Sequence, residues 1–220
     1  MRLEKVRFIT DDGLKMYGLL HLPDTDTKKV VVFIHGMHSN CFKERDDVIA
    51  EKLNNMGIAY FSFNNRGADC IIKLSDRLCG SVYEKATDCV HDINGAISAM
   101  EELGFSEIHL LGHSLGCSKI LYWYNNDKKH DVASIGLMSL TDLADKTRSV
   151  LGNEKYNEFI SVAKELINQN KGKTIMPKEA FYLPVSADCY LALFEKGGKM
   201  DFTNYTDANW DAKMLNAIKD

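Results

Sequence analysis

The sequence has little of what divides a chain into parts or directs it out of the cell. Three prolines occur in 220 residues, so no proline-rich linker interrupts it. Residues 1–7 contain no apolar stretch that could serve as a signal peptide. No aliphatic or aromatic run approaches bilayer length, and the run at residues 30–34 is far too short. These absences predict a soluble, cytoplasmic protein with no membrane partner.

An excess of charge of one sign is also missing. The chain has 27 Lys and Arg against 31 Asp and Glu, a net charge of −4. Its basic residues are scattered, whereas a nucleic-acid binder normally shows a basic face, so we expect no nucleic-acid partner. None of the six cysteines forms a C-x-x-C pair, which argues against a zinc or thioredoxin-type site. We expect reduced, mostly buried thiols, no metal and no cofactor.

What is present is a regular alternation of strand and helix patterns, in a chain that is 45% hydrophobic. Residues 4–22 alternate polar and apolar around a turn at 11–13, which predicts a β-hairpin. Residues 30–34 are all apolar and mostly β-branched, typical of a strand buried on both faces of a parallel sheet. Further strands are predicted at 58–63, 107–111 and 132–140, and helices at 43–56, 84–102 and 115–124. This order predicts an α/β fold with a mainly parallel sheet.

The pattern changes after Thr141. Residues 142–196 show only helical periodicity, which predicts a helical insertion following a strand. Its clearest apolar stripe consists of Tyr156, Phe159, Ile160, Ala163 and Ile167. A last amphipathic helix is predicted at 207–219.

Residues 112–116, Gly-His-Ser-Leu-Gly, match the pattern G-x-S-x-G. A predicted strand precedes them and a predicted helix follows, as required for a sharp turn that holds a serine nucleophile clear of the sheet. The flanking glycines suit the place where strand and helix cross closely. The pattern therefore predicts Ser114 as a catalytic nucleophile, and the alternative is an ordinary strand-to-helix turn with small residues.

A second loop, His35-Gly36-Met37, follows the most apolar strand. Acyl transfer through a tetrahedral intermediate needs two preorganised N–H donors for the oxyanion. One donor would come from the residue after the serine, Leu115, and the other from this earlier loop. Gly36 would let the loop approach the serine, so the Met37 N–H is the predicted second donor. The alternative is a simple turn after a strand, with His35 as a structural histidine.

With these motifs, the chain resembles the α/β-hydrolase superfamily, on the side of lidded serine esterases, acyl-peptidase-like enzymes and thioesterases. The resemblance implies a hydrolase core at 1–141, a helical lid at 142–206, and the start of the C-terminal part of the core at 207–220. It also implies a catalytic acid and a histidine on loops beyond the lid. The sequence ends at Asp220, where two more strands are expected.

The catalytic histidine is the part of the pattern that the sequence does not supply. After Ser114 the only histidine is His130, which is predicted at the surface and at the wrong end of the sheet. Of the others, only His38 is near enough to Ser114 to serve as a substitute base, because it directly follows Met37 in the predicted oxyanion loop (residues 35–40). The histidines excluded are His21, His91, His109 and His113. Asp142, after the strand 132–140, could be the acid or could simply cap the next helix.

Two hypotheses follow. The first is a serine hydrolase that acts on carboxylic esters or related small acyl substrates through an acyl-enzyme. The second is a truncated or degenerate, inactive hydrolase-like domain with a binding or interaction role. A histidine base discriminates between them. The strand 132–140 would be left as an open sheet edge, so self-association through it is also expected.

Overall fold

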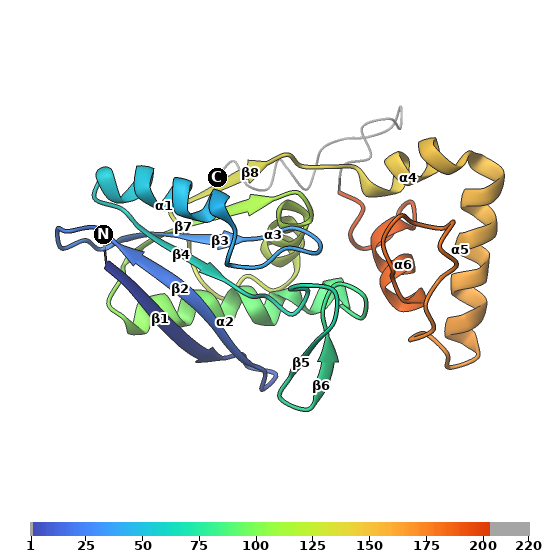
Figure 1. Cartoon of the computed structure of the whole chain (residues 1–220), viewed down its shortest axis with the longest axis horizontal. Helices are drawn as coiled ribbons and strands as arrows, with labels where there is room; N and C mark the ends of the chain where they lie inside the picture. The colour runs from blue at the N-terminus through green and yellow to red at the C-terminus, as the bar shows by residue number, and fades with distance from the viewer. Residues whose placement is uncertain (1, 203–220) are drawn as a thin grey trace.

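The computed structural model describes residues 2–202 and is built around a six-stranded mixed sheet (Figure 1). The strand order is β1-β2-β4-β3-β7-β8. The first two pairings are antiparallel and the other three are parallel. The strands are β1 (Arg2–Ile9), β2 (Lys15–Leu22), β3 (Lys29–Ile34), β4 (Ala59–Phe63), β7 (Glu107–His113) and β8 (Ser134–Met138). The predicted hairpin and the mainly parallel sheet are therefore confirmed.

Helices cover both faces of this sheet, as the all-apolar strand at residues 30–34 predicted. Val30 and Val32 on β3 pack with α2 (Cys89–Glu102) and α3 (Leu115–Asn126). Val31 and Phe33 point the other way and pack with α1 (Glu44–Asn55). Because successive side chains of a strand alternate between faces, a strand covered on both sides must be apolar at every position.

Two local features differ from the predictions. The predicted helix at 84–102 starts with a 3₁₀ turn, η1 (Ala86–Asp88), before α2 begins. The segment between β4 and η1, for which no strand was predicted, contains a small antiparallel hairpin of β5 (Ile72–Leu74) and β6 (Arg77–Cys79). Strands of three residues are too short to produce a recognisable alternation in the sequence.

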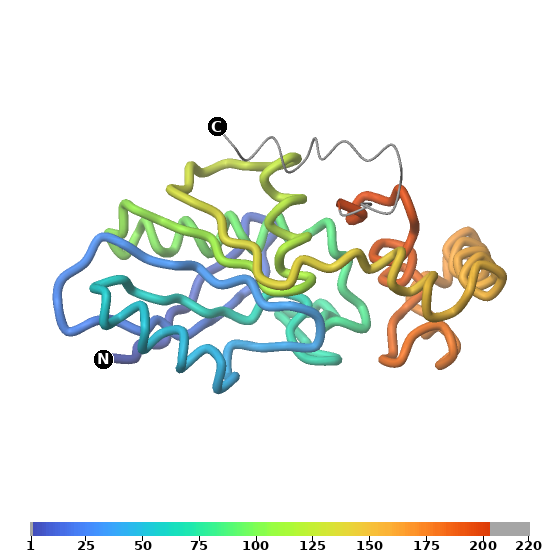
Figure 2. Tube along the Cα trace, turned by 90° about the horizontal axis from the view of Figure 1, so that it is seen from above, coloured from blue at the N-terminus to red at the C-terminus, as the bar shows by residue number. Residues whose placement is uncertain are grey.

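Beyond β8 the described chain is mainly helical, with α4 (Leu143–Leu151), α5 (Asn153–Asn168) and α6 (Ala187–Phe194). These helices lie past the end of the sheet toward which β7 points (Figures 1 and 2). They share a hydrophobic cluster with the core, since Leu115 and Leu121 of α3 pack with Tyr190 of α6. The Ser186 N–H also donates to the Val82 carbonyl at 2.9 Å. The helical region is thus anchored against the sheet end that carries Ser114.

The predicted helix at 207–219, and with it the proposed core segment 207–220, lies outside the described residues. In residues 2–202, β8 is one edge of the large sheet. None of the helices in this part of the chain combines the length and apolarity needed to cross a membrane.

Candidate active site

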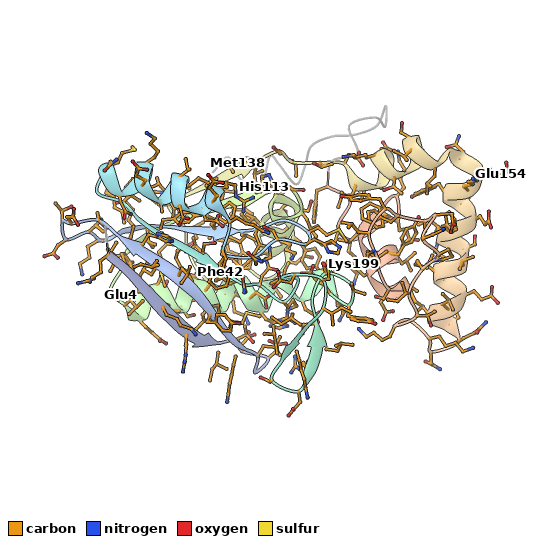
Figure 3. All side chains as sticks on the ribbon, in the orientation of Figure 1. Glu4, Phe42, His113, Met138, Glu154 and Lys199 are labelled. Carbon is orange, nitrogen blue, oxygen red and sulfur yellow. The ribbon has the colours of Figure 1, made fainter. Side chains whose placement is uncertain are left out.

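Ser114 occupies the sharp turn between β7 and α3, with backbone angles φ 54° and ψ −122°. A non-glycine residue with positive φ costs about 1–3 kcal/mol and persists only when its surroundings hold it. Two backbone hydrogen bonds do so: the Ser114 N–H donates to the Met138 carbonyl, and the Cys117 N–H donates to the Ser114 carbonyl, both at 2.9 Å. His113 and Met138 pair at the adjacent ends of β7 and β8 (Figure 3). The turn has the strained conformation that the motif predicted.

The glycine after the serine is required by close packing. A Cβ on Gly116 would lie 2.0 Å from the Ile34 carbonyl oxygen, a main-chain atom that cannot move aside. Helix α3 therefore starts directly against the end of β3. This contact places the N-terminus of α3, with its free N–H groups, beside the loop that follows β3.

That loop also reaches the serine. A Cβ on Gly36 would lie 3.0 Å from the Ser114 Cβ and 3.5 Å from its Oγ. The His35 Nδ1–H donates to the Gly36 carbonyl at 2.8 Å, and the Asn65 N–H donates to His35 Nε2 at 3.3 Å. Burial, with the nearby Lys119 charge, lowers the pKa of His35 to about 3, so the ring is neutral. His35 is thus a structural residue of the loop.

A buried ion pair lies beneath this loop, and the sequence analysis missed it. Lys119 on α3 contacts Glu84, and each side chain is 1% exposed. The Lys119 ammonium also donates to Asn65 Oδ1 at 3.1 Å. A buried charge needs a partner of opposite charge and hydrogen bonds. The available signal was a single lysine within the otherwise apolar helix that follows Ser114.

The loop after β4 has a structural role as well. Arg66 contacts Asp92 of α2 at 2.7 Å and Asp12 at 3.2 Å. Asn64 Oδ1 accepts a hydrogen bond from the Cys41 N–H at 2.8 Å. The loop therefore connects the β1–β2 turn, helix α2 and the oxyanion loop.

A cavity of about 400 Å³ opens between the serine turn and the helical region. Ser114, Met37 and Leu115 form its core side, so the structure brings the three predicted residues to one cavity. The remaining lining residues come from the segment after β8, α4 and the loop before α6: Thr141, Leu143, Lys146, Thr147, Val150, Leu151, Lys178, Glu179, Ala180, Phe181 and Tyr182. The volume falls in the usual range of small-molecule sites.

All seven histidines are among the described residues, and none hydrogen-bonds Ser114. His130 contacts Glu101 at 3.1 Å, His109 contacts Ser134 at 2.8 Å, and His91 contacts Asp11. His113 lies 3.5 Å from Arg45, and His21 packs edge-on to the Tyr60 ring. The structure therefore shows no Ser–His pair in residues 2–202.

His38, the histidine considered as a substitute base for Ser114, contacts a cysteine and not the serine. Its Nδ1 lies 3.1 Å from the Cys70 Sγ. Burial lowers its pKa, which keeps the ring neutral near pH 7. Its backbone has φ 54°, so the loop here is strained. The imidazole thus contacts the segment after β4 through Nδ1, and its Nε2 has no hydrogen-bond partner in the described part of the chain.

Asp142 acts as a helix cap. Its Oδ1 accepts a hydrogen bond from the Asp145 N–H at 2.8 Å at the start of α4. The side chain is buried, which raises its pKa. Asp142 was predicted to be either a catalytic acid or a helix cap, and the structure shows the cap. Its second carboxylate oxygen is buried and has no hydrogen-bond partner within residues 2–202.

One group of side chains in residues 2–202 has metal-ligand spacing, with ligand atoms of Asp11, Asp12 and His91 within 4.8 Å of one another. These carboxylates already form ion pairs with basic side chains. Lys129 contacts Asp11 at 2.6 Å, and Arg77 contacts Asp12 at 2.6 Å. Burial opposes ionisation of Asp12, but hydrogen bonds from Thr10 and Arg66 hold its pKa below the usual range. We assign no metal to this group.

We compared the chain with protein-family models, with curated proteins and with solved structures. The family model described as "Protein of unknown function (DUF1749)" matches residues 83–209, which is more than half of the chain. No curated protein matches the sequence.

Solved structures with the same fold are distant in sequence. The siderophore hydrolase EstB from Aspergillus fumigatus is 13% identical with a TM-score of 0.64, over 98% of this chain and 72% of that one. The α/β hydrolase GrgF from Penicillium sp. sh18 is 15% identical with a TM-score of 0.58, over 99% and 76%. A thermostable carboxyl esterase from Bacillus coagulans is 14% identical with a TM-score of 0.54, over 78% of this chain and 52% of that one. Together these findings show that the chain has the α/β-hydrolase fold and belongs to the DUF1749 family.

Proposed function

We propose that this protein is a serine hydrolase that acts on small carboxylic esters or related acyl groups. The observation that carries the proposal is the backbone of Ser114, at φ 54° and ψ −122° between β7 and α3. An ordinary strand-to-helix turn has no need of such strain at a non-glycine residue. The adjoining cavity, with Met37 and Leu115 beside the serine, supports the same reading.

In the proposed reaction, the Ser114 hydroxyl oxygen attacks the carbonyl carbon of the ester and its proton passes to water, since no histidine in residues 2–202 hydrogen-bonds Ser114. The Met37 and Leu115 N–H groups stabilise the negative oxygen of the tetrahedral intermediate. The alcohol then leaves and an acyl-serine remains, which water hydrolyses by the reverse sequence of steps. In this scheme residues 142–206 are a lid that encloses the acyl group, and within its described part α4 and the loop before α6 supply most of the cavity wall.

A second function is favoured by the histidine positions. Because no histidine in residues 2–202 hydrogen-bonds Ser114, the chain could bind an acyl ligand in the same cavity without turning it over. A serine at its free pKa is a weak nucleophile and needs an adjacent base. In that case the turn at Ser114 and the cavity serve ligand binding alone.

The test is labelling and turnover by the purified protein. We expect a fluorophosphonate probe to modify Ser114, and 4-nitrophenyl acetate to be hydrolysed in a Ser114-dependent way. Ser114→Ala should abolish both signals, whereas Ser149→Ala, an exposed serine on α4, should change neither. Absence of labelling and of any Ser114-dependent rate would overturn the hydrolase and leave the binding function.

A further inference from the structure

The cavity beside Ser114 has two kinds of wall. Its helical side is largely apolar, with Leu143 and Leu151 from α4 and Phe181 from the loop before α6. Phe181 is fixed by ring contacts with Tyr182 at 4.4 Å and with Phe194 at 4.7 Å. Such a wall takes up an apolar chain, because removal of apolar surface from water favours binding.

The same cavity also has exposed apolar side chains among its lining residues. Val150 is 78% exposed and Tyr182 is 82% exposed, the two highest values among the large hydrophobic residues of the described chain. They belong to α4 and to the loop before α6, two segments that share this cavity. Exposed apolar side chains that border a cavity are typical of a ligand-binding opening.

Two lysines from separate segments line this cavity as well. Lys146 comes from α4 and Lys178 from the loop before α6, and both are exposed. Neither has a carboxylate within ion-pair distance among residues 2–202, whereas many other lysines and arginines of this part of the chain do, for example Lys29, Lys164 and Lys196. Glu179 is the single acid in the lining, so the cavity wall carries a net positive charge.

We propose that the ligand of this cavity is an ester whose apolar chain ends in a carboxylate, and that Lys146 and Lys178 bind that carboxylate. This inference deepens the proposed function, because it takes the Ser114 cavity as the acyl site. The apolar wall holds the chain between the two ends of the ligand. Two ammonium groups that form no ion pair within residues 2–202 attract an anion, and water screens the attraction between exposed charges only in part at distances shorter than the Debye length.

The first measurement is binding to the Ser114→Ala protein, which removes turnover from the result. The probes are monomethyl suberate, with one methyl ester and one carboxylate, and dimethyl suberate, which has the same chain and no charge. We expect the charged probe to bind about two- to five-fold more tightly for each lysine it contacts, as exposed ion pairs do. This preference should fall as the salt concentration rises.

Variants then test whether Lys146 and Lys178 cause the preference for the charged probe. In the Ser114→Ala background, Lys146→Gln and Lys178→Gln should each reduce the preference for the charged probe, and Glu179→Gln should increase it. Lys155→Gln is the matched control, because Lys155 is an exposed lysine of α5 outside the cavity. Equal binding of the two probes, or a preference that the cavity variants leave unchanged, would overturn the inference.

Turnover by the wild-type protein separates this inference from the proposed function. If Ser114→Ala prefers the charged probe but the wild-type protein hydrolyses neither, the hydrolase proposal fails and the ligand class stands. If the wild-type protein hydrolyses both probes with equal kcat/KM and the lysine variants have no effect, the hydrolase proposal stands and the ligand class is wrong.

Discussion

Lys119 and Glu84 form an ion pair in the interior, where each side chain is only 1% exposed. Lys119 lies on the helix that starts at the serine turn, and its ammonium also donates to Asn65, which in turn bonds to His35 in the oxyanion loop. The pair therefore links α3 to both loops that surround Ser114. Its removal tests how much the site depends on this connection.

Lys119→Met should destabilise the protein by about 3–5 kcal/mol, because it leaves the Glu84 carboxylate buried without a counter-charge. The double variant Lys119→Met/Glu84→Leu should recover most of that loss, since it removes both charges. Urea unfolding of the single and double variants measures the difference. Lys155→Met on the surface of α5 is the control, and a Lys119→Met protein as stable as this control would contradict the expectation.

Gly116→Ala should destabilise the protein by about 1–3 kcal/mol or more, because the new methyl group would stand 2.0 Å from the Ile34 carbonyl oxygen. Gly136→Ala is the matched substitution on β8. There the nearest atom, at 2.8 Å, is the end of the Leu111 side chain, which can rotate away. Thermal unfolding should show a clear drop in Tm for the first variant and a smaller one for the second; equal drops would mean that the main chain yields at Gly116.

His35 should make stability depend on pH in mildly acidic solution. Its pKa is about 3 when folded and about 6.5 when unfolded, so between these values the unfolded chain binds the extra proton. The free energy of unfolding is therefore fully developed above about pH 6.5 and falls by up to ~1.4 kcal/mol per pH unit below it. His21, whose pKa burial also lowers, adds to the same slope.

Denaturant unfolding at several pH values between 7 and about 4 measures this slope. In His35→Gln the slope should be shallower, even if the variant is less stable at every pH. His130→Gln is the control, because that imidazole lies near the surface beside Glu101. An unchanged slope in His35→Gln would show that other groups cause the acid sensitivity.

Ester turnover should be slow. Without a histidine base beside the serine, as in residues 2–202, the oxyanion hole and binding alone provide about 10³–10⁴-fold acceleration over water. His38→Ala should leave the rate of 4-nitrophenyl acetate hydrolysis within about two-fold of the wild type, because the His38 Nδ1 contacts Cys70 and no hydrogen bond joins the ring to Ser114. A large loss of rate in His38→Ala would identify His38 as the base after all.

Strand β8 should promote self-association. It is an edge of the large sheet in residues 2–202, and an edge strand presents unpaired backbone groups to another chain. We expect light scattering coupled to gel filtration to show a mass that rises with protein concentration. A single monomeric mass over a hundred-fold range of concentration would show that this edge does not pair between copies.

The sequence by itself determined the elements that depend on near neighbours in the chain. The alternation at residues 4–22 produced the β1–β2 hairpin, and the apolar run at 30–34 became a strand covered on both faces. The turn at Ser114 followed from Gly112 and Gly116, because only residues without a Cβ fit where strand and helix cross. The fold and the serine turn were therefore predictable from local pattern and sterics.

Tertiary structure alone decided which distant side chains meet. Lys119 and Glu84 are 35 positions apart in the chain, and no periodicity marks either as buried. Lys146 and Lys178 look like two surface lysines in the sequence, and only the packing of α4 against the loop before α6 places them on one cavity. Conversely, His38, the one histidine that the sequence left open as a substitute base, contacts Cys70 in the structure. Burial, charge pairing and cavity walls depend on contacts between remote segments, which local sequence patterns do not encode.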